Sequence, residues 1–133
     1  MSIYYQNVRG IRSKLSASTT NIHLLTTPPD IIVFTETWLH PDVSDGEIGL
    51  DSFSLFRNDR FCIHNDACRG GGVLIGIKKD IAASRCTVNI TSCEQVFVKI
   101  KTPKKSIIIG AAYIPPRSPL AMYQDFLLTT SDL

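Results

Sequence analysis

The sequence predicts one domain of the α/β or α+β class in which strands outnumber helices. Its 133 residues are 44% hydrophobic and 20% charged, which is the composition of an ordinary globular domain. Apolar runs of strand length recur along the chain, and glycine or proline clusters separate them. Only two stretches have the spacing of a helix face. Because no repeat or flexible linker interrupts this pattern, we expect about seven strands and roughly two or three helices in one unit.

The chain is expected to open with a strand, a helix and a second strand. Residues 3–8 form the first strand, and the apolar positions between residues 11 and 25 recur at steps of four and three, as on one helix face. Pro28 and Pro29 end that helix. Residues 30–34 then form a strand so apolar that we expect it to be buried on both faces.

The rest of the chain is expected to be mainly hairpins. Residues 40–51 form a loop with room for one helical turn, and residues 65–72 form a turn-rich connection. The later strands are expected at residues 53–57, 73–77, 85–90, 95–101 and 106–113.

A final helix is predicted after Pro115 and Pro116. Ser118 is expected to cap it and Pro119 to occupy its first position. The face that this spacing predicts consists of Tyr123, Phe126, Leu127 and Thr130.

Charge, cysteines and apolar segments limit the function only weakly. The net charge of +2 neither requires nor excludes an anionic partner. Cys62, Cys68, Cys86 and Cys93 include no C-x-x-C pair, so we expect reduced structural thiols. No secretory signal precedes the first strand, and the longest apolar run is shorter than a membrane span. We therefore expect a nuclear or cytoplasmic protein without a membrane anchor.

The glycines around residues 71–76 do not form a phosphate-binding loop. Gly71 and Gly76 have the spacing of such a loop, but Ile77 stands where its lysine is needed. We expect these glycines to allow a bulge or a close backbone approach within a sheet.

Glu36 is the strongest candidate for a functional residue because it follows the buried strand directly. A carboxylate in that position must be hydrated, paired or bound to a metal, since an isolated buried charge is very costly. Active sites gather at such strand ends in sheets that are covered by helices. From this stretch alone, a solvated or helix-capping carboxylate is an equally good interpretation.

Polar residues also follow other apolar strands, and together they form a recognisable series. Asn7, Glu36, residues 57–60 and Tyr113 all lie at expected strand exits. In order and spacing, the chain resembles the endonuclease/exonuclease/phosphatase family, and more narrowly the endonuclease domain of non-LTR retrotransposons. The matching stretches are residues 5–10 (YQNVRG), 35–39 (TETWL), 56–60 (FRNDR), 70–75 (GGGVLI) and 113–116 (YIPP).

The resemblance implies the N-terminal part of a four-layer α-β-β-α sandwich with mixed sheets. It also implies a divalent metal, Mg²⁺ or alternatively Mn²⁺, where the strand ends converge. Glu36 would be the metal ligand, Asn7 would orient the network beside the metal, and Tyr113 would contact the phosphate. From the residues alone, Asn7 could instead satisfy a backbone group and Tyr113 could be a rim residue.

DNA is the partner that this resemblance implies, together with a reverse-transcriptase domain in the intact polyprotein. Arg9, Arg12 and Arg57 are candidate contacts to DNA phosphates. For Arg9 and Arg12, a solvated face is an equally good interpretation. Arg57 and Asp59 match the family pattern without a definite role.

The chain also departs from the family pattern. Members continue to a Gly-Asp-x-Asn motif and a terminal Asp-His pair, and neither occurs here. His23, His40 and His64 do not fit the family's motifs. We therefore expect residues 1–133 to form one partial domain, the N-terminal fragment of a magnesium-dependent DNA-nicking endonuclease that is inactive by itself. The alternatives are a non-catalytic remnant or binding module of the same fold, and a phosphatase of the same family.

Overall fold

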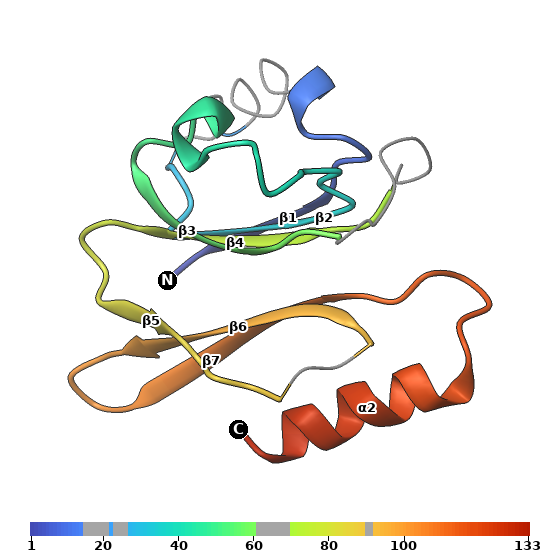
Figure 1. The fold of residues 1–133 in the computed structure, drawn as a ribbon. Coiled ribbons are helices and arrows are strands. Elements are labelled where there is room, and N and C mark those ends of the chain that lie inside the picture. Colours follow the sequence, from blue (N-terminus) through green and yellow to red (C-terminus); the bar gives the residue numbers. More distant parts are fainter. Residues whose placement is uncertain (15–21, 23–26, 61–69, 90–91) are drawn as a thin grey trace.

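Two stacked sheets form the centre of the molecule (Figure 1). The computed structural model describes residues 1–14, 22, 27–60, 70–89 and 92–133. Loops and short 3₁₀ helices lie over the outer face of the first sheet, and helix α2 (Leu120–Ser131) lies over the outer face of the second. The described part thus contains seven strands in a mixed α/β arrangement, as the sequence predicts. It matches the expected sandwich in part.

The first sheet is mixed and has the strand order β1-β2-β4-β3. β1 runs parallel to β2, whereas β2 and β3 both pair antiparallel with β4. Asn7 and Val73 both lie opposite Thr35, so the exits of β1 and β2 and the start of β4 share one edge. The strands are β1 (Ile3–Asn7), β2 (Ile31–Thr35), β3 (Phe53–Asn58) and β4 (Val73–Lys78).

The second sheet is antiparallel and has the order β5-β6-β7. The expected hairpin is confirmed, because β6 and β7 pair from Glu94 opposite Tyr113 to Lys101 opposite Ser106. The entrance of β6 and the exit of β7 therefore lie together. The strands are β5 (Ala83–Arg85), β6 (Glu94–Lys101) and β7 (Ser106–Tyr113).

β2 has a core on each of its faces, which is why all five of its residues are buried. Ile31 and Val33 belong to the core between the sheets, which also contains Val98 of β6. Ile32 and Phe34 belong to a second core beneath the loops on the other side of the sheet. The prediction of a strand buried on both faces is confirmed, and the period of two explains how one strand supplies two cores.

One local prediction needs correction. The weak strand predicted at residues 85–90 lies earlier, at Ala83–Arg85, because these residues pair with residues 98–100 of β6. The helical turn expected within residues 40–51 is confirmed, as the 3₁₀ helix Asp45–Ile48. Of the helix expected at residues 11–25, the structure describes the 3₁₀ turn Arg12–Lys14 and the buried Ile22, and the remaining positions lie outside the described residues.

The start and the inner face of α2 differ from the prediction. Pro119 is the N-cap residue, and the Ser118 hydroxyl donates to the Pro115 carbonyl at 2.7 Å instead of capping the helix. Tyr123 and Leu127 are exposed, whereas Thr129 is buried. Of the predicted face, Thr130 is also exposed and Phe126 is half-buried.

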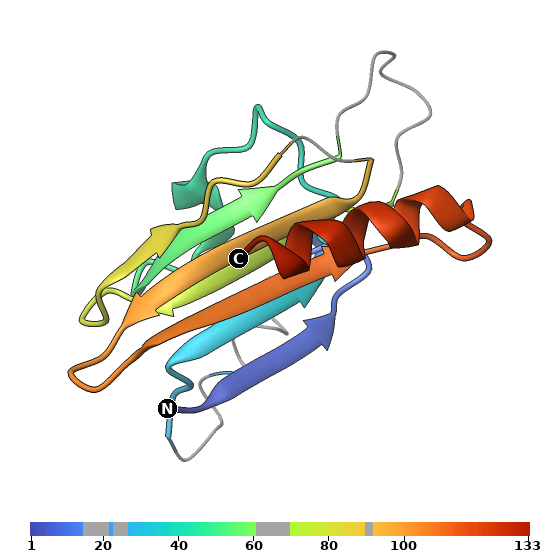
Figure 2. The same cartoon turned by 90° about the horizontal axis from the view of Figure 1, so that it is seen from below.

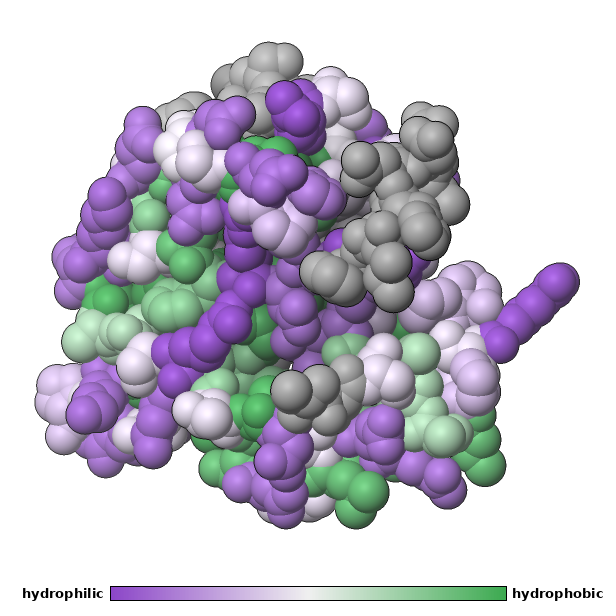
Figure 3. All heavy atoms as spheres, in the orientation of Figure 1, coloured by the Kyte–Doolittle hydropathy of each residue, from purple (hydrophilic) through white to green (hydrophobic). Residues whose placement is uncertain are grey.

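Polar contacts fix the face of α2 that meets the sheet. The Gln95 amide of β6 donates to the Thr129 hydroxyl at 3.3 Å. Figure 2 shows α2 in front of β6 and β7. The outward face is apolar in part, visible as green side chains along the lower edge in Figure 3, and includes Leu127 and Leu128.

Two further sequence expectations concern cysteines and membranes. Cys86 and Cys93 are reduced thiols, while Cys62 and Cys68 lie outside the described residues. Within the described ranges, no helix is long and apolar enough to cross a membrane.

Gly76 confirms the expected close approach within a sheet. It lies between Ile32 and Leu55 on the neighbouring strands, and a Cβ there would lie 2.6 Å from Ile32 Cγ1. Because Ile32 is fully buried, we expect Gly76→Ala to lower the free energy of unfolding by about 1–3 kcal/mol, measured by urea denaturation.

Gly46→Ala is the matched control for this prediction. Gly46 is exposed, and a Cβ there would meet nothing within 4 Å. We expect its effect to stay within about 0.5 kcal/mol. Equal stabilities of the two variants would contradict the packing described around Gly76.

Candidate active site

Glu36 lies where both sheets end on the same side of the molecule. It follows β2 directly, and Tyr113 is the last residue of β7. The Tyr113 hydroxyl donates a hydrogen bond to the Glu36 carboxylate. Two residues predicted to act together, from different sheets, are therefore in contact.

The backbone around Glu36 is held from two sides. On one side, Gly10 N–H donates to the Glu36 carbonyl at 2.8 Å and Ile11 N–H donates to the Thr37 carbonyl at 2.9 Å. On the other side, the Thr37 and Trp38 N–H groups donate to the carbonyls of residues 72 and 71, at 3.2 and 3.0 Å. Such bonding makes the segment a rigid support for a functional side chain.

The same segment has an unusual backbone conformation. Glu36 has φ 57° and Trp38 has φ 53°, values that are uncommon for residues other than glycine and rare for bulky ones. Local strain of this kind persists only where the surroundings enforce it, and it is concentrated at functional sites. Here the hydrogen bonds on both sides of the segment enforce it.

Gly10 makes room for the indole ring of Trp38. Its φ of 93° is in the left-handed region, and a Cβ there would lie 2.8 Å from the indole carbon Cε3. The indole Nε1 in turn donates to Glu36 Oε2 at 2.8 Å. Gly10 and Trp38 therefore help to orient the carboxylate.

Glu36 is more acidic than an ordinary glutamate. Burial opposes its ionisation, but hydrogen bonds from Tyr113 and Trp38 and the nearby charges of Arg9 and Arg60 outweigh burial, so the pKa lies below 4.5. Glu36 is therefore a carboxylate at neutral pH, the form that binds a metal ion.

Tyr113 is shifted in the opposite direction. Its hydrogen bond to Glu36 raises its pKa above 10, burial and the charges of Glu36 and Glu94 add to this, and Arg60 opposes it. The hydroxyl therefore remains a hydrogen-bond donor at neutral pH.

Arg60 and Glu94 are also present at the site, although the sequence analysis gave Arg60 no role of its own and did not single out Glu94. The Arg60 guanidinium carbon lies 5.9 Å from the centroid of the Tyr113 ring. Arg60 Nε forms an ion pair with Glu94 Oε1, and Gly72 N–H donates to Glu94 Oε2 at 2.7 Å. Position at a strand end was the available signal, since Arg60 lies just after β3 and Glu94 is the first residue of β6.

Other predicted residues are placed differently. Asn7 is exposed at the end of β1, opposite Thr35. Arg9 and Arg12 are exposed, and Arg9 contributes positive charge near Glu36. The roles of all three stay predictions.

Arg57 lies in an internal network. Its side chain is 14% exposed, pairs with Asp45 at 2.9 Å and Asp59 at 3.0 Å, and donates to the Val43 carbonyl at 2.6 Å. Burial raises the pKa of Asp59, against the effect of Arg57. Arg57 thus ties the loop after β2 to β3, and its contact to DNA stays a prediction.

The Glu36 carboxylate fits the ligand chemistry of magnesium. Within the described residues, no group of three or more His, Cys, Asp or Glu side chains could hold a metal ion. Magnesium needs only one or two carboxylates, because it keeps several waters and binds substrate phosphates. Glu36 can supply one of these carboxylates.

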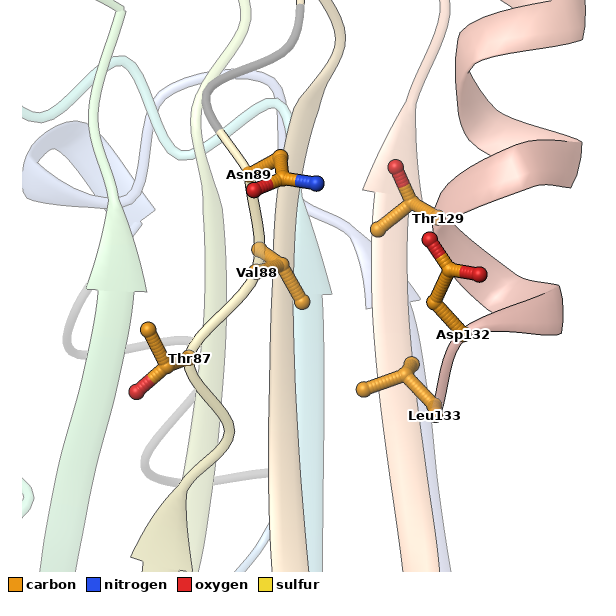
Figure 4. Close-up of a pocket in the computed structure, with 6 residues that line it drawn as sticks. All are labelled: Thr87, Val88, Asn89, Thr129, Asp132 and Leu133. Atoms are coloured by element: carbon orange, nitrogen blue, oxygen red, sulfur yellow. The ribbon is translucent and has the colours of Figure 1, made fainter.

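A separate pocket of about 120 Å³ lies between the segment after β5 and the end of α2 (Figure 4). None of the predicted site residues lines it. Its lining includes one carboxylate, and its residues are Thr87, Val88, Asn89, Thr129, Asp132 and Leu133.

Comparison with solved structures shows the fold. The chain superposes on the human Nocturnin catalytic domain with a TM-score of 0.68 and 9% sequence identity. It superposes on the endonuclease domain of TRAS1, a telomere-specific non-LTR retrotransposon, with a TM-score of 0.65 and 15% sequence identity. The matches cover 99% and 98% of this chain. Both solved domains have the endonuclease/exonuclease/phosphatase type of fold, so the expected resemblance is confirmed at the level of the fold.

The chain spans little more than half of the domains that it matches. It covers 58% of the Nocturnin domain and 54% of the TRAS1 domain. No protein-family model matches the sequence, and neither does any curated protein.

We expect Tyr113→Phe to raise the pKa of Glu36, because it removes a hydrogen bond to the ionised carboxylate. Carboxylate NMR titration of the metal-free chain measures this shift. The lowered pKa gives stability that is complete above pH 4.5 and is lost as the pH falls through the folded value. The variant should therefore lose less stability on acidification.

Tyr123→Phe is the control, because Tyr123 is exposed on α2. It should leave the Glu36 titration unchanged. An unshifted Glu36 pKa in Tyr113→Phe would show that the hydroxyl does not stabilise the carboxylate.

Proposed function

We propose that this chain carries the metal-binding part of a phosphodiesterase site that cleaves DNA, as in the endonuclease of a non-LTR retrotransposon. The main support is the ionised Glu36 carboxylate, held on a rigid, strained segment beside the Tyr113 hydroxyl. The fold that the chain shares with the TRAS1 endonuclease domain and with the Nocturnin catalytic domain adds to it.

Glu36 would hold Mg²⁺, or alternatively Mn²⁺, through its carboxylate oxygens. When bound, the metal would polarise the scissile phosphate and stabilise the leaving oxygen. The protonated Tyr113 hydroxyl can donate to a phosphate oxygen, and Trp38 keeps the carboxylate oriented. Asn7, at the adjacent strand exit, would orient the groups around the metal.

DNA is the proposed substrate because the TRAS1 match is to a retrotransposon endonuclease domain. A reverse-transcriptase domain in the intact polyprotein and a nuclear or cytoplasmic location belong to the same proposal. A phosphatase of the same fold is the second candidate for the reaction. A non-catalytic remnant or binding module of the same fold is the third candidate.

Glu36→Gln should weaken Mn²⁺ binding by the 133-residue chain by about tenfold or more, because it replaces the charged ligand with a neutral amide. Isothermal titration or electron paramagnetic resonance measures the affinity. Glu47→Gln is the control, since Glu47 is an exposed carboxylate that accepts from Ser44 N–H at 2.9 Å. Equal Mn²⁺ affinities in both variants would reject Glu36 as the ligand.

The 133-residue chain alone should not nick supercoiled plasmid DNA at a measurable rate in Mg²⁺. A general base must lie within hydrogen-bonding reach of the attacking water, and the motifs that supply this base in the resembled family do not occur in the sequence. Gel analysis of the plasmid tests this. Nicking that Glu36→Gln abolishes would mean that these residues supply the base themselves.

A further inference from the structure

We infer that Arg60 binds an anionic oxygen of the scissile phosphate and that Glu94 positions the guanidinium group for this contact. The inference rests on the proposed phosphodiesterase function and adds a substrate-binding residue to the same site. It replaces none of the roles proposed for Glu36 and Tyr113.

The location of Arg60 is the first reason. Its guanidinium carbon is 5.9 Å from the centre of the Tyr113 ring. Its positive charge helps to lower the pKa of Glu36 and opposes the rise in the pKa of Tyr113. The cation is therefore close to the carboxylate that would hold the metal and to the hydroxyl that would contact the phosphate. A phosphate at this position would be near a metal ion and an arginine, the two kinds of cation that stabilise phosphoryl oxygens.

The way Arg60 is held is the second reason. Glu94 accepts from Arg60 Nε and from Gly72 N–H through its two different oxygens, so it connects the guanidinium to the β4 entrance. A Cβ on Gly71 would lie 2.6 Å from Arg60 Cζ and 2.3 Å from Glu94 Oε2. Only a glycine leaves room for this pair against the backbone.

The chemistry of arginine is the third reason. A guanidinium group has five N–H donors in a fixed plane, and this geometry matches two oxygens of a phosphate. The Arg60 side chain is 30% exposed, so solvent and ligands can reach it. By contrast, the Arg57 side chain is only 14% exposed.

Glu94 acts through Arg60 in this arrangement. Its two oxygens accept from Arg60 and from Gly72, which defines it as a positioning residue. Its carboxylate also raises the pKa of Tyr113, so it helps to keep the hydroxyl protonated. A negative charge that merely lay nearby would repel a phosphate. A positioning carboxylate favours phosphate binding by fixing its partner.

The test is the salt dependence of DNA binding by the 133-residue chain. A short mixed-sequence duplex is titrated in Ca²⁺, which replaces Mg²⁺ so that turnover does not interfere. Arg60→Ala should weaken binding by about tenfold. It should also reduce the slope of the logarithm of the DNA-binding constant against the logarithm of the salt concentration by about 1, the effect of losing one phosphate contact.

Arg60→Lys and Lys104→Ala complete this test. Arg60→Lys should keep most of the slope and bind more weakly than the unsubstituted chain, because lysine lacks the planar fork. Lys104 is exposed in the turn between β6 and β7, at the opposite end of these strands from Glu94 and Tyr113. Lys104→Ala therefore controls for general loss of charge. Equal effects of Arg60→Ala and Lys104→Ala would overturn the inference.

Stability is measured alongside, by urea denaturation. If Arg60→Ala does not fold, Arg60→Lys decides alone. If Arg60→Lys binds DNA as tightly as the unsubstituted chain, the proposed Arg60 contact is overturned. Weaker DNA binding by Arg60→Lys, with the salt-dependence slope retained, would support the contact.

The role of Glu94 is tested with Glu94→Gln in both backgrounds. It should weaken DNA binding in the unsubstituted chain and have no effect when Arg60 is already alanine, because residues that act together are not additive. Stronger DNA binding by Glu94→Gln would show that Glu94 simply repels the phosphate, and would overturn the positioning role. Additive effects of Glu94→Gln and Arg60→Ala on DNA affinity would also overturn it.

Mn²⁺ binding separates this inference from the proposed function. Arg60→Ala should not weaken Mn²⁺ binding, because it removes a positive charge near Glu36. Loss of DNA affinity in Arg60→Ala without Mn²⁺ binding by any form of the chain would support the Arg60 contact and reject the metal-dependent function. Intact DNA binding in Arg60→Ala, together with loss of Mn²⁺ binding in Glu36→Gln, would reject the Arg60 contact and support the metal-dependent function.

Discussion

The backbone bonds on both sides of residues 36–38 are the constraint on which the rest of the site depends. Residues beyond the end of β2 would normally leave the sheet, but here neighbours on both sides hold them. This support keeps Glu36 and Trp38 in left-handed conformations that they would otherwise avoid. Because the indole of Trp38 packs on Gly10 and binds the carboxylate, the direction of the Glu36 side chain is set by backbone far from it in sequence.

The sequence was sufficient to predict the elements that depend on local pattern. The four apolar residues before Thr35 indicated a strand buried on both faces, and this strand supplies both cores. The β6–β7 hairpin was equally clear because two long apolar runs flank a short polar turn. The meeting of Glu36 with Tyr113 did not come from periodicity. It was implied by the series of motifs at the strand exits, because only the family pattern relates one sheet to the other.

What the sequence could not supply depends on side-chain direction and on contacts between distant elements. Arg57 and Arg60 are three residues apart, yet one holds a loop and the other reaches the site. Nothing local distinguishes them, because each choice depends on where Asp45 and Glu94 lie. The face of α2 was missed for a similar reason. The helix has apolar residues on more than one side, and the contact between Gln95 and Thr129 decides which side faces the sheet.

The charges at the site compensate one another in a way that suits a phosphate and a cation. Glu36 and Glu94 both raise the pKa of Tyr113, and each carboxylate accepts hydrogen bonds from its own donors. Arg60 interacts with both carboxylates, since it forms an ion pair with Glu94 and its charge also lowers the pKa of Glu36. A divalent cation at Glu36 would add positive charge beside Arg60, and that repulsion costs free energy in a partly buried site. A phosphate that contacts both cations would remove this cost, so metal and substrate should bind more tightly together than either binds alone.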